Sequence, residues 1–268
     1  MMNDKLDGVY CGDSAVLLRG LQDVCIDLTV TSPPYDDLRT YDGFTFDFET
    51  IARELFRVTK PGGVVVWVVG DGTVNGSESG ESFRQALFFK EVGFKLHDTM
   101  IYEKSGFAFP ESNRYYQVFE FMFVFAKEGK MTTNLLVDRE NRFKERWGRW
   151  TQRGRDGSLK DVDKTYKGKS HGVRFNVWRY VQGYGYGTAD GFAYEHPAMF
   201  PEELARDHIL SWSNVGDVVL DPFAGAGTTL KMAKSLGRHY IGFEISERFC
   251  KLARRRVDGA PVPLLDVK

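Results

Sequence analysis

The chain has 268 residues, of which 42% are hydrophobic and 27% charged, and its formal net charge is −1. These values are ordinary for a globular protein and leave room for one large α/β domain with an insertion. No apolar run approaches the roughly 18 residues that a membrane-spanning helix needs, and the N-terminus lacks the apolar core of a signal peptide. Composition therefore argues against membrane-spanning and secreted classes and predicts a cytoplasmic protein.

The alternation of apolar periods predicts a sheet with helices between its strands. Helices are expected over residues 15–21, 48–58 (capped by Asp47), 82–92, 201–212 and 247–256, the last with an exposed basic face. Strands are expected over residues 24–30, 64–69, 95–102, 118–126, 218–220 and 240–243. The β-branched run 64–69 suits the interior of a parallel sheet, and 95–102 with 118–126 suits a closing antiparallel hairpin. The phenylalanines in that hairpin are expected in the core: Phe119, Phe121, Phe123 and Phe125.

The first chemical motif is Thr31-Ser32-Pro33-Pro34-Tyr35, at the end of the strand expected near Val30. Proline has no N–H for the ladder and restricts the residue before it, so the chain must leave the sheet there in a stiff loop. The loop presents the Ser32 hydroxyl, the Pro33 carbonyl and the Tyr35 ring. Two acceptors and a stacking face suit a flat, amine-bearing base, whereas a rigid loop with a packed tyrosine is the plainer alternative.

The second motif is a glycine loop at residues 218–229, Val-Val-Leu-Asp-Pro-Phe-Ala-Gly-Ala-Gly-Thr-Thr. It reads as a strand, a tight turn and a helix start, and the next strand ends at Glu244. Glycines let the backbone approach a ligand closely, and an acidic residue after the next strand is placed to bind ribose hydroxyls. The combination of both motifs is far more specific than either alone.

Together these motifs resemble those of the amino-methylating DNA methyltransferases that use S-adenosylmethionine, in the permuted (beta) group where the catalytic motif precedes the cofactor motif. The resemblance runs from about Tyr10 to Arg256, and the segment from His196 to Leu204 is similar to the one that precedes the cofactor loop in this group. It implies an α/β fold with a Rossmann-like, seven-stranded, mostly parallel and circularly permuted methyltransferase sheet.

The resemblance also implies site residues. The catalytic set is Ser32, Pro33, Pro34 and Tyr35, and the cofactor-binding set is Asp13, Asp221, Pro222, Phe223, Ala224, Gly225, Gly227, Thr228 and Glu244. Asp13 has a plainer interpretation as a helix cap, Phe223 as packing under the loop, and Thr228 as a helix start. His196 is interpreted as a structural, hydrogen-bonding histidine outside the catalytic set.

The amino-acid composition of residues 139–191 differs from that of the rest of the chain. Residues 139–180 alone carry 13 Lys and Arg against 5 Asp and Glu, mixed with tryptophans and tyrosines. Such segregated positive charge suits a docked polyanion, since basic residues neutralise phosphates and arginines read guanine edges. We expect a target-recognition insertion here, loosely ordered without DNA, between a catalytic half at 1–138 and a cofactor half at 192–258, with a loose tail at 259–268. A solvated, partly disordered insertion is the alternative.

The implied activity is methyl transfer to an exocyclic amine of double-stranded DNA, with the base turned out of the helix. In the resembling family a serine in the position of Ser32 goes more often with N4 of cytosine and an aspartate with N6 of adenine, so cytosine is favoured and adenine is the alternative. RNA or protein glutamine substrates are more remote, and a binding module without chemistry is a further rival. The stretch 101–110 matches only loosely the one common in cytosine-N4 members.

The cysteines add no further chemistry. Cys11, Cys25 and Cys250 form no Cys-x-x-Cys pair, so neither a disulfide framework nor a zinc cluster is indicated, and all three are expected to be buried. None follows a proline, as the nucleophile of cytosine ring-carbon methylation does in its family. We therefore expect no metal and no membrane partner. Dimers are common in the resembling group, and the sequence leaves open both the oligomeric state and a restriction, solitary or phage origin.

Overall fold

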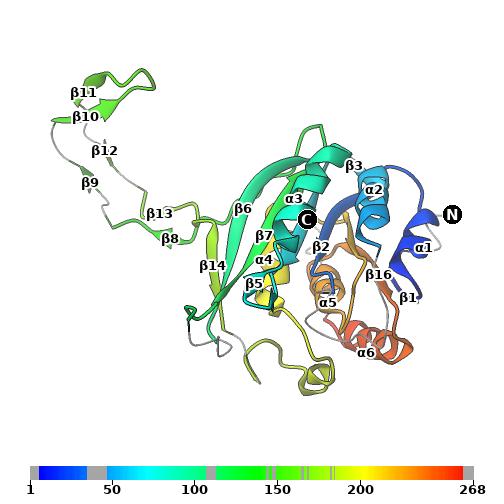
Figure 1. The fold of residues 1–268 in the computed structure, drawn as a ribbon. Coiled ribbons are helices and arrows are strands. Elements are labelled where there is room, and N and C mark those ends of the chain that lie inside the picture. Colours follow the sequence, from blue (N-terminus) through cyan, green and yellow to red (C-terminus); the bar gives the residue numbers. More distant parts are fainter. Residues whose placement is uncertain are drawn as a thin grey trace. The chain divides into compact units, whose positions relative to one another are not determined.

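The structure of the protein is a computed structural model that describes residues 6–34, 47–106, 113–142, 145–146, 149–163, 166–167, 169–181, 183 and 185–261. The chain forms two compact units, and Leu135–Phe175 make up the second. Figure 1 shows the first unit as a sheet with helices on both of its faces. None of the helices in the described part of the chain has the length and apolarity needed to traverse a bilayer.

The first unit is built on an eight-stranded sheet. In spatial order its strands are β1 (Gly8–Cys11), β16 (His239–Glu244), β15 (Val218–Asp221), β2 (Ile26–Thr31), β3 (Thr59–Val69), β7 (Phe119–Ala126), β6 (Lys95–Lys104) and β14 (Val177–Tyr180). All neighbouring strands pair in parallel except those on either side of β7. The expectation of a mostly parallel α/β sheet with a closing antiparallel hairpin is confirmed.

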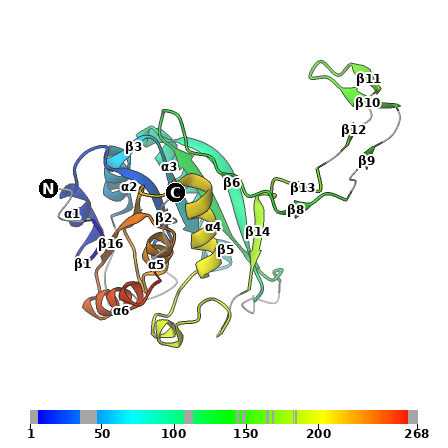
Figure 2. The same ribbon diagram turned by 180° about the vertical axis from the view of Figure 1, so that it is seen from behind.

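In the part of the chain that the structure describes, six α-helices flank the sheet in two groups. One group is α1 (Ser14–Arg19), α2 (Phe48–Val58) and α3 (Glu81–Val92), and the other is α4 (Glu202–Trp212), α5 (Thr228–Ser235) and α6 (Glu247–Asp258). Helices within each group pack side by side, and Figure 2 shows α4 in front of the sheet, on the face opposite the view of Figure 1. A short 3₁₀ helix, Gly191–Glu195, precedes α4.

Along each buried strand, successive side chains point alternately toward the two helix layers, because side chains of a β-strand alternate between the two faces of the sheet. Val65, Trp67 and Val69 of β3 belong to the apolar core that also contains the buried faces of α1, α2 and α3. On the other face Gly242 of β16 lies so close to α5 that an added Cβ would stand 2.2 Å from the Leu230 side chain. The two helix layers hold the parallel strands level with one another, so the loops that follow the carboxyl ends of these strands lie at one edge of the sheet.

The eighth strand, β14, departs from the expected seven-stranded sheet. Its residues lie inside the segment 139–191 that composition assigns to the insertion, yet Val177–Tyr180 pairs in parallel with β6. Trp178 and Tyr180 are buried while the residues beside them are exposed. Four residues are too few for periodicity to reveal a strand, and the surrounding arginines conceal its two buried aromatics. The separate unit therefore ends at Phe175.

Two expectations about single residues are wrong. Phe119 is 36% exposed because it begins β7 at the rim of the sheet, whereas Phe123 and Phe125 are buried as expected. Cys11 is exposed, while Cys25 and Cys250 are buried.

The second unit is a nested antiparallel ribbon. Its pairs, from base to tip, are β8 (Arg139–Glu140) with β13 (His171–Gly172), β9 (Glu145–Arg146) with β12 (Tyr166–Lys167), and β10 (Arg149–Arg153) with β11 (Leu159–Asp163). A turn that includes Gly157, in the left-handed region at φ +83°, closes the tip. The described residues of this unit thus form three nested antiparallel pairs, and loose ordering without DNA stays a prediction.

Candidate active site

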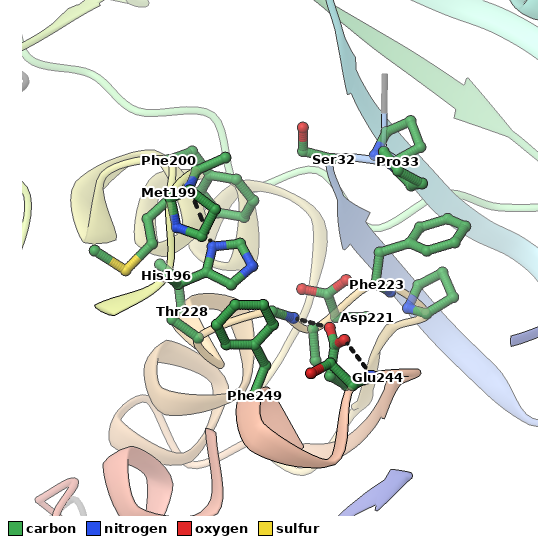
Figure 3. Close-up of a pocket in the computed structure, with 18 of the residues that line it drawn as sticks. Ser32, Pro33, His196, Met199, Phe200, Asp221, Phe223, Thr228, Glu244 and Phe249 are labelled. Carbon is green, nitrogen blue, oxygen red and sulfur yellow. Dashed lines mark hydrogen bonds between the residues drawn. The ribbon is translucent and has the colours of Figure 1, made fainter. Parts of the chain in front are cut away.

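A cavity of about 460 Å³ lies at the edge of the sheet where β2, β15 and β16 end. Because these three strands are neighbours and parallel, their carboxyl ends bring together loops that are about 190 residues apart in the chain. Figure 3 shows Ser32 and Pro33 above Phe223, with His196 and Phe249 on the opposite side and Asp221 and Glu244 between them.

The cavity gathers most of the residues predicted from the sequence. Those that line it are Asp13, Ser32, Pro33, Pro34, Asp221, Pro222, Phe223, Ala224, Gly225, Thr228 and Glu244. Gly227 is not among the lining residues, and Tyr35 lies outside the described residues. The two motifs, separated in the sequence, thus face one space.

Asp221 connects the two motifs directly. It is 2% exposed, and its Oδ1 accepts hydrogen bonds from the Thr31 hydroxyl at 2.6 Å and from the Phe223 N–H at 3.0 Å. Thr31 immediately precedes Ser32, so this carboxylate fixes the start of the Ser-Pro-Pro loop against the start of the glycine loop. Burial raises the pKa of Asp221 to about 6, although the hydrogen bond from Thr31 and the Phe223 N–H oppose the rise.

This raised pKa predicts a pH-dependent stability. A carboxyl whose pKa is higher in the folded state favours folding at low pH, and that contribution is lost as the pH rises through about 6. Asp221→Asn removes this titration. The melting temperature of the variant minus that of wild type should therefore be larger at pH 7.5 than at pH 5. Asp47→Asn is the control, because the hydrogen bond from Thr50 lowers the pKa of Asp47 and keeps its titration below this window. Equal differences at both pH values for Asp221→Asn would contradict the assignment.

Glu244 organises the glycine loop from the end of β16. Its Oε2 accepts from the Gly225 N–H at 2.9 Å, and its Oε1 accepts from the Ser246 N–H at 2.8 Å. Burial raises the pKa of Glu244, which these backbone donors partly offset. Gly225 is in the left-handed region at φ +50°, and a Cβ there would stand 2.9 Å from His196 Nε2. The loop is therefore closely packed between the carboxylate and the histidine.

For Asp13 and Phe223 the sequence allows both a structural and a cofactor-site interpretation, and each residue makes a structural contact and also lines the cavity. Asp13 caps α1, with its Oδ1 accepting from the Val16 N–H at 2.9 Å, and it also lines the cavity. Phe223 packs edge-on against Trp67 with ring centroids 6.1 Å apart, and it also lines the cavity. For both residues a structural contact fixes the side chain at the edge of the site.

Gly227 and Thr228 begin α5. Gly227 is its N-cap, at φ +77°, and a Cβ there would stand 3.0 Å from the Ala253 Cβ of α6. Thr228 is 5% exposed, and its hydroxyl accepts from Arg256 at 2.8 Å. Arg256 is itself buried, which corrects the expectation that the whole basic face of α6 is exposed. Its acidic partners lie more than 50 residues earlier in the chain, so no local pattern in the sequence could indicate its burial.

The cavity has further walls that residue patterns alone did not identify. The segment from Tyr194 to Pro201 lines one side, where the His196 ring packs on Phe249 with centroids 4.4 Å apart and its Nδ1 accepts from the Ala198 N–H. Toward the antiparallel hairpin, Lys104 and Glu120 form an ion pair that also lines the cavity. The similarity of residues 196–204 to the segment before the cofactor loop was the only sequence signal for these walls.

Comparison with known families decides what kind of site this is. Residues 26–255 match the family model described as DNA methylase, which acts on the N6 and N4 amino groups of bases. The chain belongs to this family. The resemblance to amino-methylating DNA methyltransferases that use S-adenosylmethionine is thereby confirmed, and the chain is a methylase with the motif order of the permuted group.

Individual relatives of this methylase agree with the family. The orphan methyltransferase M.BamHII of Bacillus amyloliquefaciens is 58% identical over 243 residues, covering 89% of this chain and 91% of that one. The DNA adenine methyltransferase YhdJ of Escherichia coli is 29% identical, covering 93% and 82%. A proposed DNA modification methylase from Thermus thermophilus, solved with S-adenosyl-L-methionine, superposes with a TM-score of 0.62 and 25% identity, covering 96% and 99%.

The cavity of this methylase fits a molecule such as S-adenosylmethionine. Its volume lies within the range of about 300–1,000 Å³ that small-molecule sites occupy. It combines the Glu244 carboxylate with the Phe223 and Phe249 rings, and it lies at the carboxyl ends of parallel strands, where α/β sheets bind nucleotide-like ligands. In the described ranges of the chain no group of three His, Cys, Asp or Glu side chains is arranged to hold a metal ion.

Proposed function

We propose that this methylase transfers a methyl group from S-adenosylmethionine to the N4 amine of a cytosine turned out of double-stranded DNA. One observation carries the proposal: Ser32 and Pro33 line the same cavity as the Asp221–Thr228 loop and Glu244. An amine held by the first pair would therefore face whatever the second set binds. Adenine N6 is the alternative target.

On the amine side, the residues act by orientation. The lone pair of an exocyclic amine is delocalised into the ring, and it becomes available when the N–H groups are drawn into hydrogen bonds that favour a pyramidal nitrogen. The Ser32 hydroxyl and the Pro33 carbonyl are the two acceptors for these bonds. Because the chain leaves β2 through two prolines, both acceptors are fixed before the base arrives, which favours an in-line approach of the nitrogen.

A base inside the duplex must leave the stack to reach this cavity, at a cost of a few kcal/mol. Stacking on an aromatic ring returns about 1–3 kcal/mol per base. Tyr35 follows the two prolines directly, so we assign it this stacking role, although it lies outside the described residues.

On the cofactor side, we assign Glu244 to the ribose hydroxyls, Asp13 to the adenine amine and the backbone around residues 224–227 to the methionine portion. The bound cofactor supplies an electrophilic methyl group on a sulfonium. The chain's part is to hold that group opposite Ser32. Asp221 does this indirectly, because it fixes the starts of both loops to each other through Thr31 and Phe223.

The choice of cytosine rests on Ser32, since the resembling family pairs a serine here more often with N4 of cytosine. The 29% identical relative is named as an adenine enzyme, which keeps adenine as the alternative. The test is to express the protein in a bacterial strain that lacks its own DNA methyltransferases and to measure modified nucleosides by mass spectrometry. N4-methylcytosine is the expected product. N6-methyladenine would overturn the choice of base, while the proposed methyl transfer to an exocyclic amine would still hold.

The second unit is our candidate for DNA contact, as the core of a target-recognition region within 139–191. Residues 135–175 carry 12 Lys and Arg against 6 Asp and Glu, and their paired strands form a two-stranded ribbon. The DNA major groove admits such a ribbon, and arginines and lysines neutralise the phosphates beside it. We accordingly propose that the ribbon reads the target site in a cytoplasmic enzyme related to the methyltransferases of restriction-modification systems, and a homodimer stays a prediction.

Removal of the ribbon tip tests this assignment. Replacing residues 149–163 by a short Gly-Ser turn should reduce DNA methylation to background, because the contacts that hold the target are lost. Binding of S-adenosylmethionine should be unchanged, because every described residue that lines the cavity belongs to the first unit. Calorimetry and a methylation assay on the same preparation check both results. Full methylation by the shortened protein would exclude a role for the tip.

A further inference from the structure

Four charged side chains form a cluster behind the glycine loop. Asp190 and Glu202 supply two carboxylates, and Lys231 of α5 and Arg256 of α6 supply two cations. Lys231 Nζ lies 2.7 Å from Asp190 and 2.8 Å from Glu202, and Arg256 lies 3.0 and 2.5 Å from the same two carboxylates. Burial alone would raise the pKa of Glu202, yet hydrogen bonds from Lys231, Thr188 and Arg256 lower it. The same two cations lower the pKa of Asp190, so both acidic groups are carboxylates near neutral pH.

Arg256 does more in this cluster than balance charge. Its side chain is 1% exposed, and its Nε and one terminal nitrogen serve the two carboxylates. Its other terminal nitrogen donates to the Thr228 hydroxyl at 2.8 Å and to the Ala226 carbonyl at 3.3 Å. Ala226 and Thr228 lie on either side of Gly227 in the loop assigned to the cofactor. A planar guanidinium presents donors in several fixed directions, which a lysine ammonium on a flexible stem does not.

The two carboxylates also have an informative position in the chain. Asp190 and Glu202 stand immediately before and after residues 191–201, the segment that contributes Tyr194, His196 and Met199 to the opposite wall of the cavity. Both ends of this segment are therefore attached to the same guanidinium. Arg256 is thus the one side chain among the described residues that bonds to the glycine loop and to both ends of the facing segment.

We propose that Arg256 is a positioning residue for the cofactor, which sets the distance between the glycine loop and the segment 191–201. This inference rests on the proposed function of the cavity. The guanidinium orients the Ala226 carbonyl and the Thr228 hydroxyl, and through Asp190 and Glu202 it holds the facing wall at a fixed separation. It acts on the cofactor through these groups. Thr228, which the resemblance assigns to cofactor binding, accordingly serves as an anchor for the loop.

Lys231 provides a matched comparison. It binds the same two carboxylates and is similarly buried, at 9% exposure, but the hydrogen bonds of its side chain go to Asp190 and Glu202 and not to the glycine loop. Its backbone N–H donates to the Gly227 carbonyl, and a substitution of the side chain leaves that bond in place. Exchanging lysine and arginine at the two positions keeps every charge. Arg256→Lys removes the bonds to the loop, whereas Lys231→Arg leaves them in place. A purely structural role for the cluster would make both variants less stable and would affect cofactor binding in neither.

The experiment measures the dissociation constant of S-adenosylmethionine by calorimetry, at a temperature where each variant is folded, together with its melting temperature. Arg256→Lys should weaken binding roughly tenfold or more, which corresponds to the loss of one or two buried hydrogen bonds. Lys231→Arg should stay within about threefold of wild type. In DNA methylation, Arg256→Lys should raise the KM for the cofactor by a larger factor than it lowers kcat. Equal affinities of the Arg256→Lys and Lys231→Arg variants would overturn the proposal.

The hydrogen bond from Arg256 to Thr228 can also be tested by substituting Thr228, so the proposal stays testable if Arg256→Lys does not fold. Thr228→Val removes the acceptor hydroxyl and Thr228→Ser retains it, so the valine variant should weaken cofactor binding by a clearly larger factor than the serine variant. Arg256→Lys combined with Thr228→Val should bind no more weakly than the worse single variant, because both remove one shared bond. Full additivity, or wild-type binding by Thr228→Val, would contradict the role. A wild-type protein that binds no S-adenosylmethionine would instead overturn the proposed function.

Discussion

Ser32→Ala should lower the rate of methyl transfer by about 10²- to 10³-fold, the effect seen when one pre-organised polar contact to a reacting group is removed. The hydroxyl is one of two acceptors assigned to the target amine, and the Pro33 carbonyl alone cannot orient both N–H bonds. Cofactor affinity should change little, because the groups assigned to the cofactor lie on β15, on β16 and in the loops that follow β1, β15 and β16, and none lies in the loop after β2. Single-turnover methylation at saturating cofactor measures the effect.

Ser32→Asp is the matched control for this experiment. A carboxylate also accepts hydrogen bonds from an amine, and the resembling family places aspartate here in enzymes that methylate adenine. The aspartate variant should therefore retain more activity than the alanine variant. A wild-type rate in Ser32→Ala would remove the hydroxyl from the mechanism, and a ranking in which alanine exceeds aspartate would show that an acceptor is not what the position requires.

Glu244→Ala should weaken binding of S-adenosylmethionine by roughly a hundredfold, since a buried hydrogen-bonding group left without its partner costs about 1–3 kcal/mol. The variant removes the acceptor of both the Gly225 and the Ser246 N–H groups and the carboxylate assigned to the ribose. Glu244→Gln keeps one acceptor oxygen and should lose less. Isothermal calorimetry measures both variants, and wild-type affinity in Glu244→Ala would exclude the residue from the cofactor site.

Much of the first unit could be predicted from the sequence because its signals are local. Helix α2 has the predicted bounds, since Asp47 accepts from the Thr50 N–H at its start and apolar residues recur at helical spacing along it. The strand ends that carry Ser32 and Asp221 were found through proline and glycine, which act on the backbone wherever they stand. Their meeting in one cavity follows from the parallel neighbours β2 and β15.

What the sequence concealed depends on distant partners. Arg256 follows two exposed arginines in α6, and only Asp190 and Glu202, 66 and 54 residues away, make its burial favourable. Strand β14 is recognisable only through its pairing with β6, because its four residues lie within a basic segment. The ribbon of the second unit likewise depends on pairing across its tip, where Trp150 stands opposite Val162. Periodicity and composition carry no information about such pairings.

The most direct test of the account is to incubate the purified protein with methyl-labelled S-adenosylmethionine and unmethylated bacterial DNA, and then to digest the DNA and locate the label. We expect the label on an exocyclic amine, with cytosine N4 favoured over adenine N6, and we expect the label to be lost in Ser32→Ala. Label on a ring carbon, or on RNA or protein while the DNA stays unlabelled, would contradict this expectation.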